Sequence, residues 1–118
     1  MKLILSTENA FKTIKLRELI IKALKGELDN IKIDTWAYTK SNENYDIIYH
    51  NPSQYVDAPD KNVLFNLEVD DSIVQFSIVW WAKNPEPSEE IKCLHVGRLT
   101  EMLLRYFRGE YIKLSVID

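Results

Sequence analysis

The chain has 118 residues, of which 46% are hydrophobic and 28% are charged, with a formal net charge of −3. This balance excludes a disordered chain, and the length predicts a single globular domain over residues 1–118. The only cysteine is Cys93, which excludes a disulfide framework, and no apolar run approaches the roughly 20 residues of a membrane span. We therefore expect a cytoplasmic protein with no membrane partner.

The first 25 residues predict a short strand followed by a helix. Residues 1–5 are apolar and favour a strand. Ser6 or Thr7 is expected to cap a helix that runs to Lys25. Gly26 follows at the position where a left-handed residue often ends a helix.

Two further strands and a long loop are expected next. Residues 31–38 alternate as in a half-buried strand, which would direct Trp36 and Tyr38 to the outer face of the sheet. Residues 45–49 predict the following strand. Residues 50–62 contain two prolines and form a loop of 13 residues, a length that is uncommon in compact domains and is often functional.

Residues 63–81 predict a β-hairpin, because two runs of β-branched and aromatic residues flank an acidic turn. With Asp70 and Asp71 as the loop residues, Phe65 would face Phe76. The face expected to form the core consists of Val63, Phe65, Leu67, Val69, Val74, Phe76, Ile78 and Trp80. The opposite face is mixed and consists of Leu64, Asn66, Glu68, Ile73, Gln75, Ser77, Val79 and Trp81.

The C-terminal third predicts a second helix and a closing strand. Ser88 is a good N-cap, and the helix should end near Arg108, before Gly109. Residues 110–118 predict a strand that a crossover connection would place parallel to a neighbour. The expected fold is α+β, with two helices packed on a mostly antiparallel, mixed sheet of five or six strands in the order (β)αββββαβ.

An acidic, aromatic surface is the main functional indication. Residues 27–90 contain four Lys and thirteen Asp or Glu, a net charge of −9. Trp and Tyr commonly anchor protein interfaces, and surrounding charges add specificity. The residues expected to bind a partner are Trp36, Tyr38, Trp81, Glu68, Asp70 and Asp71 on the outer face, with Tyr55 and Asp57 in the long loop. A helix on each side of the sheet would instead cover this face, so both arrangements stay open.

The sequence favours a non-catalytic binding protein over an enzyme. A basic protein is the expected partner, and a pI near 5.4 argues against nucleic acid. Small inhibitors and immunity proteins that occlude a basic site share this physical type, although no sequence resemblance supports the comparison. No metal or cofactor site is predicted.

Two alternatives remain. The first is a small hydrolase or ligand-binding protein in which His50 acts with Asp46, Asp57 or Asp60, although these carboxylates lack a recognisable ligand spacing. The second is a structural homo-oligomer formed through the broad helices or an open edge of the sheet.

Overall fold

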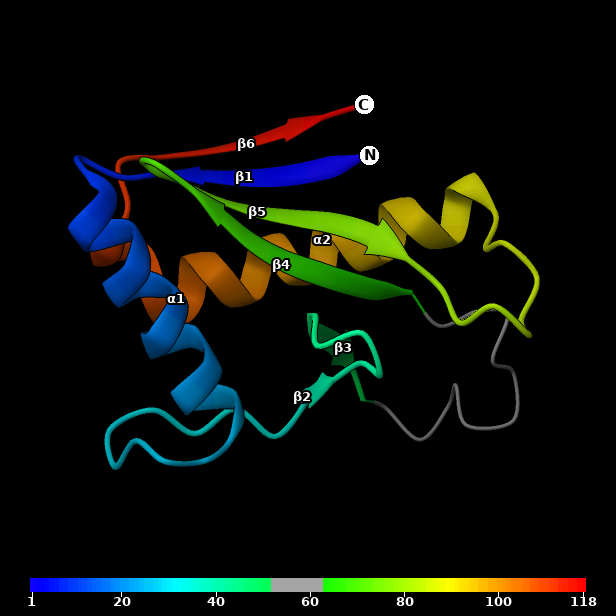
Figure 1. Ribbon diagram of the computed structural model, residues 1–118, viewed down its shortest axis with the longest axis horizontal. Helices are drawn as coiled ribbons and strands as arrows, with labels where there is room; N and C mark the ends of the chain where they lie inside the picture. Colours follow the sequence, from blue (N-terminus) through cyan, green and yellow to red (C-terminus); the bar gives the residue numbers. More distant parts are fainter. Residues whose placement is uncertain (52–62) are drawn as a thin grey trace.

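The computed structural model describes residues 1–51 and 63–118, which contain two helices and a six-stranded sheet (Figure 1). A short 3₁₀ turn, η3, joins the second helix to the last strand. The elements in chain order are β1 (Lys2–Ser6), α1 (Ala10–Leu24), β2 (Trp36–Lys40), β3 (Asp46–His50), β4 (Leu64–Asp70), β5 (Ile73–Val79), α2 (Glu89–Phe107), η3 (Arg108–Glu110) and β6 (Lys113–Ile117).

The sheet has the strand order β2-β3-β4-β5-β1-β6, and every neighbouring pair is antiparallel. The predicted α+β fold and its element order are therefore confirmed. The prediction that the last strand lies parallel to a neighbour is wrong, because β1 occupies the position between β5 and β6. The crossover through α2 passes over β1, so β6 pairs with β1 in the antiparallel sense.

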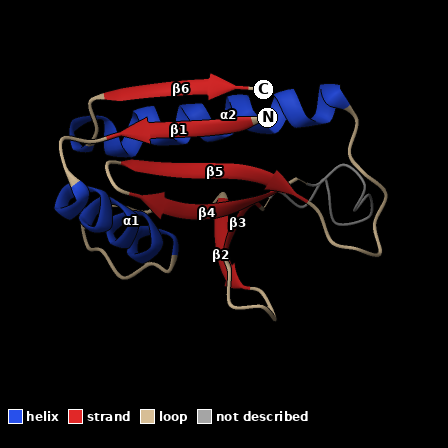
Figure 2. Ribbon diagram, turned by 45° about the horizontal axis from the view of Figure 1, so that its top comes forward, coloured by secondary structure: helices blue, strands red, loops and turns tan. Residues whose placement is uncertain are grey.

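Both helices contribute to one core on one face of the sheet. The buried cluster joins Leu16 and Ile20 of α1, Leu99 and Leu103 of α2, and Phe65 of β4. In Figure 2, α2 runs behind the part of the sheet that contains β1 and β6. The two-layer arrangement leaves the opposite face, here called the outer face, without a helix over it among the described residues. Neither described helix is long and apolar enough to cross a membrane.

The β4–β5 hairpin has the predicted faces but a different turn. Asp70 pairs with Ile73 and Leu67 pairs with Phe76, so the loop residues are Asp71 and Ser72. Moving the turn by one residue shifts the register by two, and a shift of two returns each side chain to the same face. Asp71 takes a φ of 47°, a left-handed conformation that Asp tolerates better than most residues.

Trp80 departs from the predicted core face. Phe65 and Phe76 are fully buried as expected, whereas Trp80 is 38% exposed. It lies beyond the last residue of β5, where the alternation of the strand no longer fixes its direction. The Lys92 ammonium instead lies 5.4 Å from the centre of its ring.

The helix boundaries depend on side-chain caps. Ser88 caps α2 as predicted by accepting a hydrogen bond from the backbone N–H of Ile91. The cap of α1 is Asn9, not Ser6 or Thr7, since Asn9 Oδ1 accepts from the Lys12 N–H at 2.9 Å. The Thr7 hydroxyl instead lies 2.5 Å from that of Thr13, inside the fold.

Candidate protein-binding cleft

Trp36 and Tyr38 lie on the helix-covered face of the sheet, so their predicted position on the outer face is wrong. Tyr38 pairs with Ile48, which in turn pairs with the buried Phe65. Side chains directly opposite one another share a face, which puts Tyr38 and Trp36 on the core side. Trp36 is only 4% exposed.

The error arises from where β2 begins. The alternation of residues 31–38 was interpreted as one strand, but residues 26–35 contain no strand. Ile33 is buried and Ile31 packs against the core from this irregular segment. Because the segment is not pleated, its apolar spacing does not set the facing of Trp36 in the strand that follows.

A cleft opens on the outer face, at the end of the sheet where β4 begins and β5 ends. Its volume is about 550 Å³. The floor contains Ile47 of β3 and Leu64 of β4, which are 4% and 3% exposed. Half-exposed aromatic rings from Tyr45 and Trp81 stand at its rim. Its lining residues are Ser41, Asn42, Glu43, Tyr45, Ile47, Leu64, Asn66, Val79, Trp80, Trp81 and Ala82.

Strand pairing explains how these apolar side chains meet. Leu64 pairs with Tyr49 on one side and with Val79 on the other, so residues from three strands share this part of the outer face. Ile47 lies opposite Asn66 in the next pair of the ladder. The cleft is therefore held by the rigid centre of the sheet, and the segments that carry Tyr45 and Trp81 border it.

The charge of the cleft is acidic. Among the described lining residues, Glu43 is the only one with a charge. Glu68 lies close by on the outer face of β4, where its carboxylate accepts a hydrogen bond from the Asn66 amide at 2.8 Å. The rim therefore combines aromatic rings with carboxylates, while the Lys92 ammonium lies 5.4 Å from the ring of Trp80, which also lines the cleft.

The predicted partner-binding residues are only partly gathered here. Trp81 lines the cleft, and Glu68 lies beside it. Asp70 and Asp71 lie at the far end of the β4–β5 hairpin, about 20 Å from Leu64 along the strand. Tyr55 and Asp57 are outside the described residues.

Several lining residues of the cleft were not predicted from the sequence, among them Glu43, Tyr45 and Ile47. Tyr45 and Ile47 were assigned to a strand, but the sequence did not predict which face of the sheet they occupy. The pairing that orients β3 involves β4, which is distant in the chain. The signal was present in the alternation of β3: if Ile48 packs in the core, Ile47 must face outward. Both are apolar side chains next to residues already predicted for this face.

Asp46, proposed for the hydrolase alternative, is part of a structural ion cluster. It accepts hydrogen bonds from Arg17 of α1 and from the Tyr38 hydroxyl, the latter at 2.6 Å, and the Lys40 ammonium lies 3.4 Å away. Burial alone would raise the pKa of Asp46, but the bonds from Tyr38 and Arg17 outweigh it and lower the pKa. Burial and the Asp46 carboxylate raise the pKa of Tyr38 to about 12.

His50 lies in a separate polar depression of about 200 Å³ on the helix side. Its Nδ1 is 3.2 Å from Arg98, and its ring stands edge-on to Trp36 with centroids 5.3 Å apart. Burial, followed by the positive charge of Arg98, lowers the pKa of His50. Asp46 is engaged elsewhere, and Asp57 and Asp60 are outside the described residues, so no described carboxylate of the predicted set meets His50.

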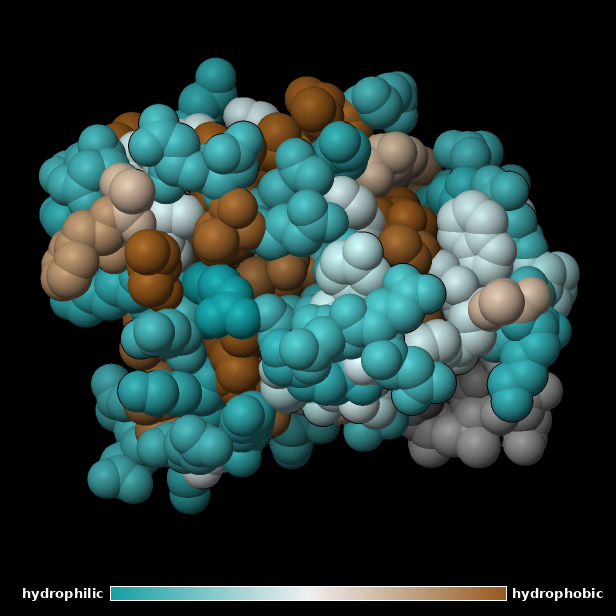
Figure 3. Space-filling model, viewed as in Figure 1, coloured by the Kyte–Doolittle hydropathy of each residue, from teal (hydrophilic) through white to brown (hydrophobic). Residues whose placement is uncertain are grey.

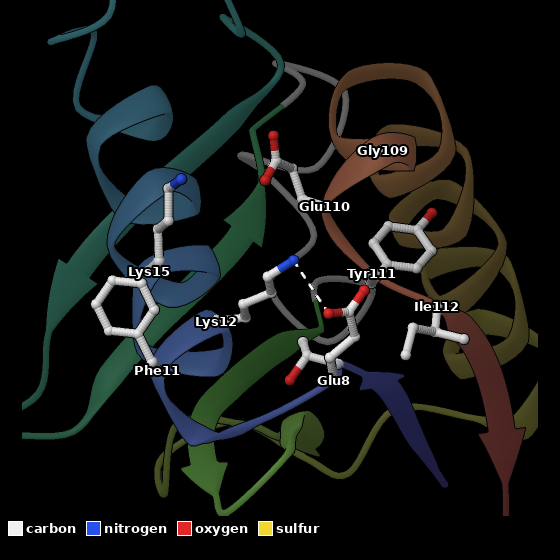
Figure 4. Close-up of a pocket in the computed structure, with 9 residues that line it drawn as sticks. Glu8, Phe11, Lys12, Lys15, Gly109, Glu110, Tyr111 and Ile112 are labelled. Carbon is white, nitrogen blue, oxygen red and sulfur yellow. Dashed lines mark ion pairs between the residues drawn. The ribbon is translucent and has the colours of Figure 1, made fainter.

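A third depression lies between the start of α1 and the segment that leads to β6 (Figure 4). Its volume is about 150 Å³. Lys12 and Glu8 point toward one another there and form an ion pair at 3.2 Å, which neutralises both charges. Among the described residues, no group of three or more His, Cys, Asp or Glu side chains could hold a metal ion.

Comparisons with models of protein families, with curated proteins and with solved structures find no significant match.

Proposed function

We propose that this chain is a non-catalytic protein-binding module whose outer-face cleft receives a basic segment of another protein. The observation that carries the proposal is the cleft itself. Its floor is apolar, and its rim bears Tyr45 and Trp81. Glu43 is the one charged residue among the described lining, and the Glu68 carboxylate accepts a hydrogen bond from Asn66, which also lines the cleft. An apolar centre with aromatic anchors and a charged rim is the usual anatomy of a specific interface.

Charge favours a basic partner. The stretch of sequence that contains every described lining residue, residues 27–90, has a net charge of −9, and an excess of negative charge favours encounter with a positively charged surface over an acidic one. Aromatic rings also attract Lys and Arg side chains through their faces. Occlusion of a basic site on the partner, as an inhibitor or immunity protein would achieve, is the expected mode of action.

The test is affinity capture with three versions of the chain. The cleft variant is Tyr45→Ala with Trp81→Ala, and the matched control is Phe11→Ala, which removes a ring that is 75% exposed on α1. Both changes affect exposed side chains, so both proteins should fold. We expect wild type and control to capture the same partner and the cleft variant to lose it.

Direct binding to that partner then gives the magnitude. Loss of an aromatic anchor that becomes buried in the complex should weaken binding by about 2 kcal/mol, which is about 30-fold in Kd. Glu43→Lys should mainly slow association and reduce its dependence on salt. Equal capture by wild type and the cleft variant, or capture of nothing by wild type, contradicts the proposal.

A further inference from the structure

The edge strand β6 has a free side. Among the described strands it is hydrogen-bonded only to β1. A free edge presents unpaired backbone N–H and C=O groups, and proteins commonly protect it with several charges or with proline. The five residues of β6 include one charge, that of Lys113, and no proline.

Apolar side chains are exposed along this edge. Val116 and Ile117 are 49% and 46% exposed, on opposite faces of the strand, and Ile112 just before β6 is 66% exposed. In Figure 3, hydrophobic surface is visible at the upper border, where β6 ends in Figure 1. Exposed apolar side chains along a free strand edge favour pairing with another strand.

Helix α2 contributes an exposed apolar side chain, Leu104, on its flank away from β3. Its Arg98 flank faces β3, where it contacts His50. Thr100 and Leu104 lie about 160° and 120° from Arg98 around the helix axis, which directs them away from β3. Leu104 is 37% exposed.

We propose that β6 pairs with the β6 strand of a second copy of this chain, in the antiparallel sense about a two-fold axis perpendicular to the sheet. Such an axis keeps the helices of both copies on the same side of the continuous sheet. The only allowed registers are therefore those that pair helix-side residues of one copy with helix-side residues of the other. The register that uses the whole strand places the axis at Ser115. Leu114 then lies opposite Val116 of the second copy, and the helix-side apolar surface continues across the boundary.

The charge pattern favours a second copy as the occupant. In this register Lys113 lies opposite Ile117 of the other chain, and the two Lys113 side chains are at opposite ends of the ladder. Four residues separate them, about 14 Å, which exceeds the Debye length of about 8 Å in physiological salt. The paired strands therefore bring apolar side chains together without opposing like charges.

The size of the contact predicts a weak dimer. A five-residue ladder is about 17 Å long, and the sheet with the helix layer packed on it is about 10 Å deep. The contact between the two copies is therefore small, and its buried area falls below the roughly 1,200 Å² of a standard interface. We expect a dissociation constant in the micromolar range.

The test is the molar mass in solution, measured by sedimentation from about 1 μM to about 1 mM protein, a range that brackets such constants. Val116→Lys introduces a charge at the pairing edge, at a position already half exposed. The control is Ile14→Lys, where a residue 51% exposed on α1 receives the same charge. We expect wild type and control to dimerise alike and Val116→Lys to dissociate at least tenfold more easily. A monomeric wild type, or dimerisation unaffected by Val116→Lys, overturns the proposal.

Disulfide trapping provides a second readout that does not depend on the stability of that variant. Ser115→Cys is made together with Cys93→Ser, because Cys93 is exposed. Directly opposite residues bring their Cβ atoms to about 5 Å, close enough for a disulfide after small adjustments. We expect covalent dimers under mild oxidation, formed faster than with Ser77→Cys on the interior strand β5. Equal rates for the two positions contradict the pairing at β6.

Discussion

Asp46→Asn is expected to lower the free energy of unfolding by about 2–4 kcal/mol at pH 7. The Asp46 side chain is 8% exposed and holds Arg17, Tyr38 and Lys40 together on the helix side of β3. Breaking a buried ion pair by removing one partner costs about 3–5 kcal/mol. The side chains of Arg17 and Lys40 are 29% and 48% exposed, so water can solvate them after the substitution, which reduces the cost.

The effect should depend on pH with a definite sign. The pKa of Asp46 in the folded chain is below its ordinary value of 3.8. The carboxylate therefore stabilises the fold fully above about pH 5, and this contribution is lost progressively as the pH falls below the unfolded-state value toward the folded one. Wild type and Asp46→Asn should differ most near pH 7 and converge in acid.

Urea unfolding followed by circular dichroism at pH 7 and pH 3 measures both effects. Glu8→Gln is the control, because its pair with Lys12 is exposed on both sides and should contribute less than about 1 kcal/mol. If Asp46→Asn destabilises the chain equally at the two pH values, the negative charge is not the source of the stabilisation and the reasoning fails.

Other outcomes follow from burial, backbone geometry and charge. Leu103→Ala, at a fully buried site, should lower the free energy of unfolding in urea by about 2–5 kcal/mol. Leu104→Ala, at the next residue, should lower it clearly less because Leu104 is 37% exposed. Equal losses of stability would contradict the orientation of α2. Asp71→Gly should be tolerated, whereas Asp71→Val should cost about 1–2 kcal/mol because φ is positive there. The pKa of His50, measured by NMR, should lie below its ordinary value of 6.5, and Arg98→Ala should move it upward. The contribution of His50 to stability should fall as the pH drops below 6.5. An unchanged pKa in the variant would exclude the charge of Arg98 as a cause.

The hairpin shows how far local sequence determines this fold. Phe65 and Phe76 share the core face in the sequence and in the structure because alternation fixes the side of every residue in a strand. The turn was misplaced by one residue because the acidic run allows two loops of equal length. The pairing of Asp70 with Ile73 and the left-handed conformation of Asp71 distinguish them, and the sequence contains no glycine there to indicate the turn.

Long-range pairing accounts for what was missed. Trp36 was directed to the wrong face because the preceding isoleucines pack from an irregular segment, and only the partner strand β3 shows the true facing. The insertion of β1 between β5 and β6 is likewise a contact between residues distant in the chain. The cleft depends on the same kind of contact: Trp81 was predicted to lie on the outer face, whereas the positions of Tyr45 and Ile47 depend on the pairing of β3 with β4.

The two proposed interfaces lie in different parts of one sheet and can therefore be tested separately. The cleft is built on β3, β4 and β5, and β1 separates β5 from the β6 edge. A dimer formed through β6 would leave both clefts open and carry two partner molecules. Val116→Lys should then change the assembly mass while one partner still binds each chain with unchanged affinity, measured by calorimetry. If Val116→Lys also removes partner binding in a folded chain, the two surfaces are coupled, and their assignment to separate parts of the sheet is wrong.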